Sequence, residues 1–127
     1  AERGVRDMSG GERAKTLIAR LLVTGAPLLM ADEPTAGLDP HAALAAMDIL
    51  RSRAEGGAAV VATLHDLTLA ARACDRLAVM SAGRVLVLGP PAEALAPPVL
   101  AEAFGLEGEL IATPAGAVLA VRRLHQG

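Results

Sequence analysis

Two acidic residues, Asp32 and Glu33, follow a short apolar run and have the chemistry to assist a hydrolytic reaction. The run begins at Leu28, and Pro34 biases Glu33 away from helical dihedral angles. An acidic pair at the carboxyl end of a buried strand lies where open α/β sheets place their ligands. Asp32 could hold Mg²⁺ through water, and Glu33 could orient and polarise an attacking water molecule. The alternative is a solvated acidic turn without a function.

Near the start of the chain, a pair of glycines stands where a helix is predicted to begin. Ser9 and Glu12 form a capping box, and the apolar residues that follow repeat with a helical period until Gly25. Gly10 and Gly11 would each cost a helix about 1 kcal/mol relative to alanine. They also allow a ligand to approach bare backbone N–H groups at the positive end of the helix dipole, which suits a phosphate. The alternative is a well-capped helix start and nothing more.

Two further residues, His65 and Asp39, have both a functional and a structural interpretation. His65 ends a second apolar run beside Asp66, and its imidazole could contact a γ-phosphate oxygen and sense its loss. A single histidine is, however, more often a packed or surface residue. Asp39 precedes Pro40, and a role as helix N-cap explains it without any further function. Cys74 is expected to be a packing residue.

The elements that must position these residues follow from the apolar pattern. Residues 28–32 and 58–64 are continuous apolar runs, which is typical of buried strands. Between them, a helix is predicted to start after Asp39 and to stop at residues 56–57, both glycine. A short helix over 67–73 follows the second strand. Strand, helix and strand, with both strands apolar throughout, indicate a parallel sheet covered on both faces.

The second half of the chain has a different pattern. Apolar runs at 77–80 and 85–88 flank a glycine-containing turn and predict a β-hairpin. Four prolines then punctuate a short helical tail that ends near Phe104. A last pair of apolar runs, 110–112 and 118–121, brackets a second turn with proline and glycine.

Composition narrows the class of protein. Hydrophobic residues make up 53% of the 127 residues but Phe104 is the single aromatic, so the core is expected to consist of Ala, Leu and Val. The net charge of −2 is spread without blocks of one sign, which argues against nucleic-acid binding. No apolar run approaches the roughly 18 residues that a membrane-spanning helix needs, so a soluble chain is expected.

In their order and spacing, these motifs resemble the second half of an ABC-transporter ATP-binding domain. Residues 8–12, Met-Ser-Gly-Gly-Glu, are similar to the signature motif. Residues 28–32 resemble the Walker B strand, and Glu33 the catalytic glutamate that follows it. Residues 36–39 resemble the D-loop, and His65 the switch histidine. The C-terminal tail looks most like the branch that imports iron-siderophores, haem and cobalamin.

The resemblance implies an α/β fold, namely a partial P-loop NTPase (ABC ATPase) fold with parallel strands, covering helices and C-terminal antiparallel hairpins. Residues 1–127 would form the C-terminal portion of a single ABC ATPase domain. The implied activity is hydrolysis of ATP with Mg²⁺, which powers import of an iron-siderophore, haem or cobalamin-type substrate. The implied location is the cytoplasm, peripherally on the cytoplasmic face of the cell membrane.

The resemblance also implies partners and residue roles. Two ATPase subunits would form a head-to-tail dimer that drives transmembrane permease subunits and, indirectly, serves a substrate-binding protein. Glu33 and His65 would be catalytic, and Asp32 would hold the metal ion. The residues implied to bind the nucleotide, in part across the dimer, are Ser9, Gly10, Gly11, Glu12 and Asp39.

One departure from the family pattern concerns the phosphate-binding loop. No G-x-x-x-x-G-K-[ST] sequence occurs in the 127 residues, and the chain opens on Ala1 without a methionine. We therefore expect a C-terminal fragment, without the Walker A part, that alone binds ATP poorly and hydrolyses none. One alternative is a non-catalytic interaction module that contributes only the signature motif in trans, which would leave Glu33 and His65 without a role. Another is a non-transport ABC ATPase, which the importer-like tail disfavours.

Overall fold

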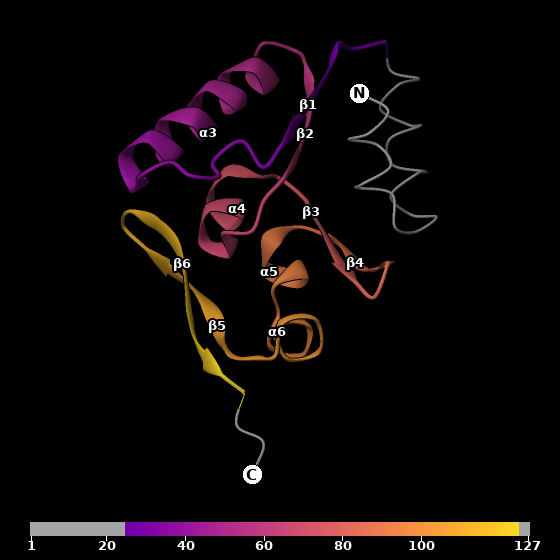
Figure 1. Cartoon of the computed structure of the whole chain (residues 1–127), viewed down its shortest axis with the longest axis vertical. Helices are drawn as coiled ribbons and strands as arrows, with labels where there is room; N and C mark the ends of the chain where they lie inside the picture. Colours follow the sequence, from indigo (N-terminus) through magenta and orange to yellow (C-terminus); the bar gives the residue numbers. More distant parts are fainter. Residues whose placement is uncertain (1–24, 125–127) are drawn as a thin grey trace. The chain divides into compact units, whose positions relative to one another are not determined.

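A computed structural model describes residues 25–124 of the chain (Figure 1). The chain divides into two compact units, residues 1–65 and residues 66–127. The acidic pair and His65 all belong to the first unit, whereas the C-terminal hairpins belong to the second. The candidate signature residues 8–12 lie outside the described residues.

In the first unit, two parallel strands are joined by a helix. Strand β1 (Leu28–Asp32) pairs with β2 (Ala59–Thr63) in a register that runs from Leu28↔Ala59 to Asp32↔Thr63. The helix α3 (Pro40–Glu55) makes the crossover that a parallel pair requires, and it contacts β2 (Figure 1). The carboxyl ends of both strands therefore lie at the same edge of the sheet.

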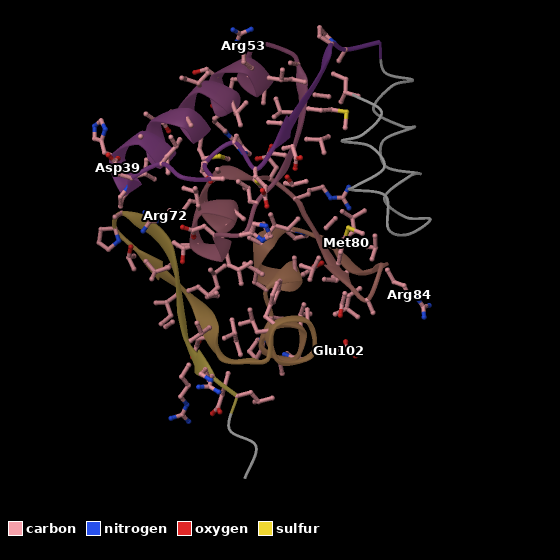
Figure 2. All side chains as sticks on the ribbon, viewed as in Figure 1. Asp39, Arg53, Arg72, Met80, Arg84 and Glu102 are labelled. Atoms are coloured by element: carbon pink, nitrogen blue, oxygen red, sulfur yellow. The ribbon has the colours of Figure 1, made fainter. Side chains whose placement is uncertain are left out.

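The start and end of α3 follow from local chemistry. Asp39 is the N-cap, and its Oδ1 accepts a hydrogen bond of 2.8 Å from the backbone N–H of Ala42. Pro40 occupies the first helical position, where its missing N–H costs nothing. Gly56 is the C-cap. The positive charge of Arg53 in the last turn interacts favourably with the negative end of the helix dipole. Figure 2 shows Asp39 and Arg53 at opposite ends of this helix.

The second unit begins with the short helix α4 (Leu67–Ala73), for which Asp66 is the N-cap. The hairpin β3 (Leu77–Ser81) and β4 (Arg84–Gly89) turns through two residues, Ala82 and Gly83, both with positive φ. In Figure 2, Arg84 marks the end of this turn.

Two short helices and a second hairpin complete this unit. They are α5 (Pro91–Ala94), α6 (Pro97–Phe104), β5 (Leu106–Thr113) and β6 (Gly116–Arg123), with β5 and β6 antiparallel. Between β5 and β6, the carboxylate of Glu107 accepts a hydrogen bond of 2.8 Å from Arg122, and this contact raises the pKa of Arg122.

Small aliphatic residues make the core of the second unit, as the composition predicts. Val79, Ala94, Leu95 and Leu100 form its buried cluster, and partly buried leucines and valines of α4, the strands and α6 pack around it. Phe104, the single aromatic residue, is 39% exposed and contributes little to this core. Cys74 is partly buried and is the C-cap residue of α4.

The hairpin β5–β6 is held against α4 by two polar contacts. Arg72 donates from Nε to the carbonyl of Ala117 at 2.7 Å, and the N–H of Leu119 donates to the hydroxyl of Thr68 at 3.1 Å. Arg72 is labelled in Figure 2. Both contacts link residues 45 or more positions apart, so they define the packing of the unit rather than local structure.

The predicted α/β fold with a parallel strand pair and C-terminal antiparallel hairpins is confirmed. The last hairpin is longer than predicted, because β5 starts at Leu106 and not at Leu110. Within residues 25–124, no helix is both long enough and apolar enough to cross a membrane.

Candidate functional site

Asp32 lies at the last position of β1, opposite Thr63 at the last position of β2. The hydroxyl of Thr63 donates a hydrogen bond of 2.6 Å to Oδ1 of Asp32. This bond joins the two strand ends through side chains as well as through the backbone. The carboxylate of Asp32 is therefore held at the edge of the sheet where α/β folds bind their ligands.

Glu33, the next residue, leaves the strand with a backbone conformation that is unusual for a residue with a side chain. Its φ is 48°, in the left-handed region. Its N–H donates to both acceptors of Thr63, at 2.8 Å to Oγ1 and at 3.1 Å to the carbonyl oxygen. Its own carbonyl accepts from the N–H of Ala36 at 3.1 Å, which closes a turn directly after the strand. Two acceptors on one neighbouring residue thus hold the strained conformation.

His65 lies two residues beyond the end of β2 and reaches across to Glu33. Nε2 of His65 and Oε1 of Glu33 are in direct hydrogen-bonding contact. The side chain of His65 is 88% exposed and that of Glu33 is 44% exposed. The pair is therefore accessible to a ligand, and packing does not prevent either side chain from changing partner.

The other predicted site residues divide into two groups. Asp39 lies in the described part of the chain, and its carboxylate is engaged by the first turn of α3. The proposed role of Asp39 at a nucleotide stays a prediction, because no contact with a ligand tests it. Ser9, Gly10, Gly11 and Glu12 lie outside the described residues.

At the strand ends, the carboxylate of Asp32 is a suitable ligand for Mg²⁺ that is also bound by a nucleotide. Among residues 25–124, no cluster of three or more His, Cys, Asp or Glu side chains could enclose a metal ion. Mg²⁺ does not need such a cluster, because it keeps several waters and is bound through one or two carboxylates together with substrate phosphates. A single well-held carboxylate, Asp32, therefore fits Mg²⁺ that arrives with a nucleotide, and does not fit a dedicated protein cage.

Thr63 is the residue of this site that the sequence analysis missed. It makes hydrogen bonds to both acidic residues. Its signal lay in the pairing of the strands: β2 ends at Thr63, one residue before the end of the predicted run 58–64, and the parallel register places Thr63 opposite Asp32. A hydroxyl placed there can only be recognised once that register is known.

The sequence of the chain is similar to those of known ATP-binding proteins. The family model for ABC transporters matches residues 1–36. The chain is 44% identical over 127 residues to the hemin import ATP-binding protein of Rhodococcus jostii, an alignment that covers 99% of this chain and 44% of that protein. It is 42% identical over 125 residues to the cobalamin import ATP-binding protein of Halobacterium salinarum, covering 98% of this chain and 31% of that protein. The chain belongs to the ABC transporter family of ATP-binding proteins.

A solved ABC transporter structure confirms the predicted partial ABC ATPase fold. It is cbiO1 from Clostridium perfringens, which is described as part of the ABC transporter complex cbiONQ. It is 32% identical, with a TM-score of 0.50, and the match covers 77% of this chain and 39% of that one. This ABC family chain therefore spans less than half the length of each of these three relatives.

Proposed function

We propose that this chain contributes the hydrolytic part of the ATP site in an ABC importer subunit. The observation that carries the proposal is the cluster at the carboxyl ends of β1 and β2, where Asp32, Glu33 and His65 come together. An acidic residue that ends a partly buried parallel strand, followed by a second one in contact with a histidine, is suited to phosphoryl transfer. The hemin and cobalamin import proteins among the relatives favour import of a haem, cobalamin or iron-siderophore type of substrate.

Asp32 would bind the Mg²⁺ ion that accompanies the nucleotide, directly or through water. Its carboxylate can accept more hydrogen bonds than the one from Thr63, so an oxygen remains for a cation or for the cation's waters. Mg²⁺, when bound, would neutralise charge on the phosphates. Asp32 itself does no proton transfer in this scheme; it orients and binds.

Glu33 accepts a hydrogen bond from the attacking water and polarises it. The contact with His65 sets the direction of the Glu33 carboxylate before the nucleotide arrives. The second oxygen of Glu33 is then the acceptor for the water. A γ-phosphate would offer His65 a second acceptor, so the histidine could report whether that phosphate is present.

The remaining parts of the site come from residues outside this cluster. We propose that Ser9, Gly10, Gly11 and Glu12 contact ATP on a second subunit of a head-to-tail dimer, and that Asp39 lies near the same interface. The dimer would act on transmembrane permease subunits at the cytoplasmic face of the membrane. Residues 1–127 contain no phosphate-binding loop, so that loop has to come from another segment or another chain.

Two proteins test the proposal. The first is the 127-residue chain, which should release no phosphate from ATP above background, because no loop cradles the phosphates. The second is a chimaera in which residues 1–127 replace the matching segment of the hemin import ATP-binding protein of Rhodococcus jostii. We expect the remainder of that protein to supply the phosphate-binding loop. The chimaera should hydrolyse ATP in the presence of Mg²⁺.

The variant Glu33→Gln in the chimaera identifies the residue that activates water. Glutamine keeps the shape of the side chain but cannot accept a proton, so kcat should fall by about 10²-fold or more. ATP binding, measured with a fluorescent nucleotide, should stay within a few-fold of the parent. Loss of nucleotide affinity together with kcat would contradict the role in activating water. An inactive chimaera that still binds ATP would favour a non-catalytic module.

A further inference from the structure

We propose that Thr63 is a positioning residue of the ATP site, whose one hydroxyl group sets both the carboxylate of Asp32 and the backbone of Glu33. The inference rests on the proposed function, because it assigns a residue to that same site. It is carried by two hydrogen bonds at the ends of β1 and β2, of 2.6 Å to Asp32 and of 2.8 Å from Glu33.

The direction of each hydrogen bond is determined by the groups themselves. A hydroxyl has one hydrogen to donate and two lone pairs that accept. The N–H of Glu33 can only donate, and the ionised carboxylate of Asp32 can only accept. Thr63 therefore uses its single hydrogen on Asp32 and a lone pair on Glu33. The hydrogen bond from Glu33 thus helps to orient the hydroxyl group, and the oriented hydroxyl group donates its hydrogen to Asp32.

The bond to Glu33 bears directly on where its carboxylate goes. In a continued strand, successive side chains alternate between the two faces of the sheet, so Asp32 and Glu33 would diverge. The left-handed φ of 48° at Glu33 interrupts that alternation. Such a conformation is strained for a residue with a side chain and persists only where its surroundings hold it. Thr63 provides that support from its hydroxyl and its carbonyl together.

Threonine suits this position better than serine because its side chain is less free to rotate about χ1. Its branched Cβ restricts χ1 in a strand, and it favours the extended backbone of β2. The hydroxyl is therefore held in one direction, and both of its partners with it. Serine would keep the chemistry with more freedom, whereas valine would keep the shape without the chemistry.

The test compares Thr63→Val with Thr63→Ser in the chimaera. Thr63→Val should raise the Mg²⁺ concentration for half-maximal ATP hydrolysis by about 10-fold or more, as expected for loss of a group that orients a metal ligand. It should also lower kcat at saturating Mg²⁺, because Glu33 is less well placed. Thr63→Ser should restore both values to within about threefold of the parent. A purely structural role would lower the urea midpoint of unfolding and leave the Mg²⁺ requirement unchanged.

Thr113→Val is the matched control. The hydroxyl of Thr113 also donates one hydrogen bond, to the carbonyl of Gly116, and accepts one, from the N–H of Ala115. It lies at the end of β5, beside the turn of the C-terminal hairpin, so its loss should leave the Mg²⁺ requirement as it is. Should Thr63→Val not fold, Thr63→Ala provides a second variant without the hydroxyl.

The outcomes separate this inference from the proposed function. A parent chimaera that hydrolyses ATP, with hydroxyl-free variants that match its Mg²⁺ requirement and kcat, overturns the role of Thr63 alone. A parent chimaera that binds but does not hydrolyse ATP overturns the proposed function, and the role of Thr63 with it. A raised Mg²⁺ requirement in Thr113→Val as well would also overturn the role, because it would show a general effect of losing a threonine hydroxyl.

Discussion

Glu33 and His65 are 32 positions apart in the chain, and Oε1 of the glutamate is in hydrogen-bonding contact with Nε2 of the histidine. The contact follows from topology, because parallel strands that end in register deliver the next residues of both to one edge. The histidine is mostly exposed, so its ring is accessible from solvent while it contacts Glu33. One nitrogen cannot give a full hydrogen bond to the glutamate and to a phosphate at once. For Nε2 of His65, the contact with Glu33 and the proposed contact with a phosphate would therefore be alternatives.

The first prediction concerns the donor at Nε2 of His65. In the chimaera, His65→Ala should lower kcat by about 10²-fold, the size of effect seen when one oriented donor to a reacting group is removed. His65→Gln should lose less activity, because the amide of glutamine can also donate. The KM for ATP should change little in both variants. Steady-state kinetics at saturating Mg²⁺ give both constants.

Equal loss in His65→Ala and His65→Gln would show that a neutral amide donor cannot replace the imidazole. Unchanged kcat in His65→Ala would remove the histidine from the mechanism. In that case the contact with Glu33 would be no more than a surface ion pair, which contributes little.

The second prediction separates the two interpretations of Asp39. In the 127-residue chain, Asp39→Ala removes the cap of α3 and should lower the free energy of unfolding by about 1 kcal/mol. Asp39→Asn should cost much less, because asparagine caps helices about as well as aspartate. Urea denaturation followed by circular dichroism measures both.

The same pair of variants in the chimaera tests whether Asp39 has a role beyond the cap. If capping is its whole role, Asp39→Asn should hydrolyse ATP like the parent. A large fall in the ATPase rate of Asp39→Asn, at unchanged stability, would instead show that the charge of Asp39 is needed at the nucleotide or at the dimer interface.

The parts of the fold that carry local signals could be predicted from the sequence. Helix α4 was predicted at 67–73 and is observed over Leu67–Ala73, because Asp66 caps it and the apolar pattern is clear. The start of α3 was equally predictable from Asp39 and Pro40. The acidic pair was expected at the end of a buried strand, and β1 does end at Asp32. In each case, residues within one turn or one strand length decide the structure.

The parts that depend on distant pairing could not be predicted in the same way. The role of Thr63 depends on a register with residues about 30 positions away. The left-handed conformation of Glu33 contradicts its local preference and is held by that same neighbour. The first half of β5, Leu106 to Glu109, contains charged residues and a glycine, and it becomes a strand because β6 pairs with it throughout. Local propensity disfavours these conformations, and long-range hydrogen bonds prevail.

The last prediction concerns Gly108 of β5, where a side chain would collide with the backbone of β6. Its φ is 153°, and a Cβ atom there would lie 2.0 Å from the carbonyl oxygen of Ala120 and 2.8 Å from Cα of Val121. Both are backbone atoms, so the clash can be relieved only by moving β6. Gly108→Ala should therefore lower the free energy of unfolding by about 3 kcal/mol or more, from overpacking and backbone strain together.

Gly83→Ala is the control for Gly108→Ala, because it separates strain from crowding. Gly83 also has a positive φ, of 76°, but nothing lies within 4 Å of its Cβ position. Its substitution should cost only the backbone strain, about 1–2 kcal/mol. Urea unfolding of both variants of the 127-residue chain gives the comparison. Equal losses would mean that β5 and β6 do not approach closely at Gly108, and the observed register of the hairpin would be wrong at that position. A loss confined to Gly108→Ala, or much larger there, would support the register that brings Gly108 opposite Val121.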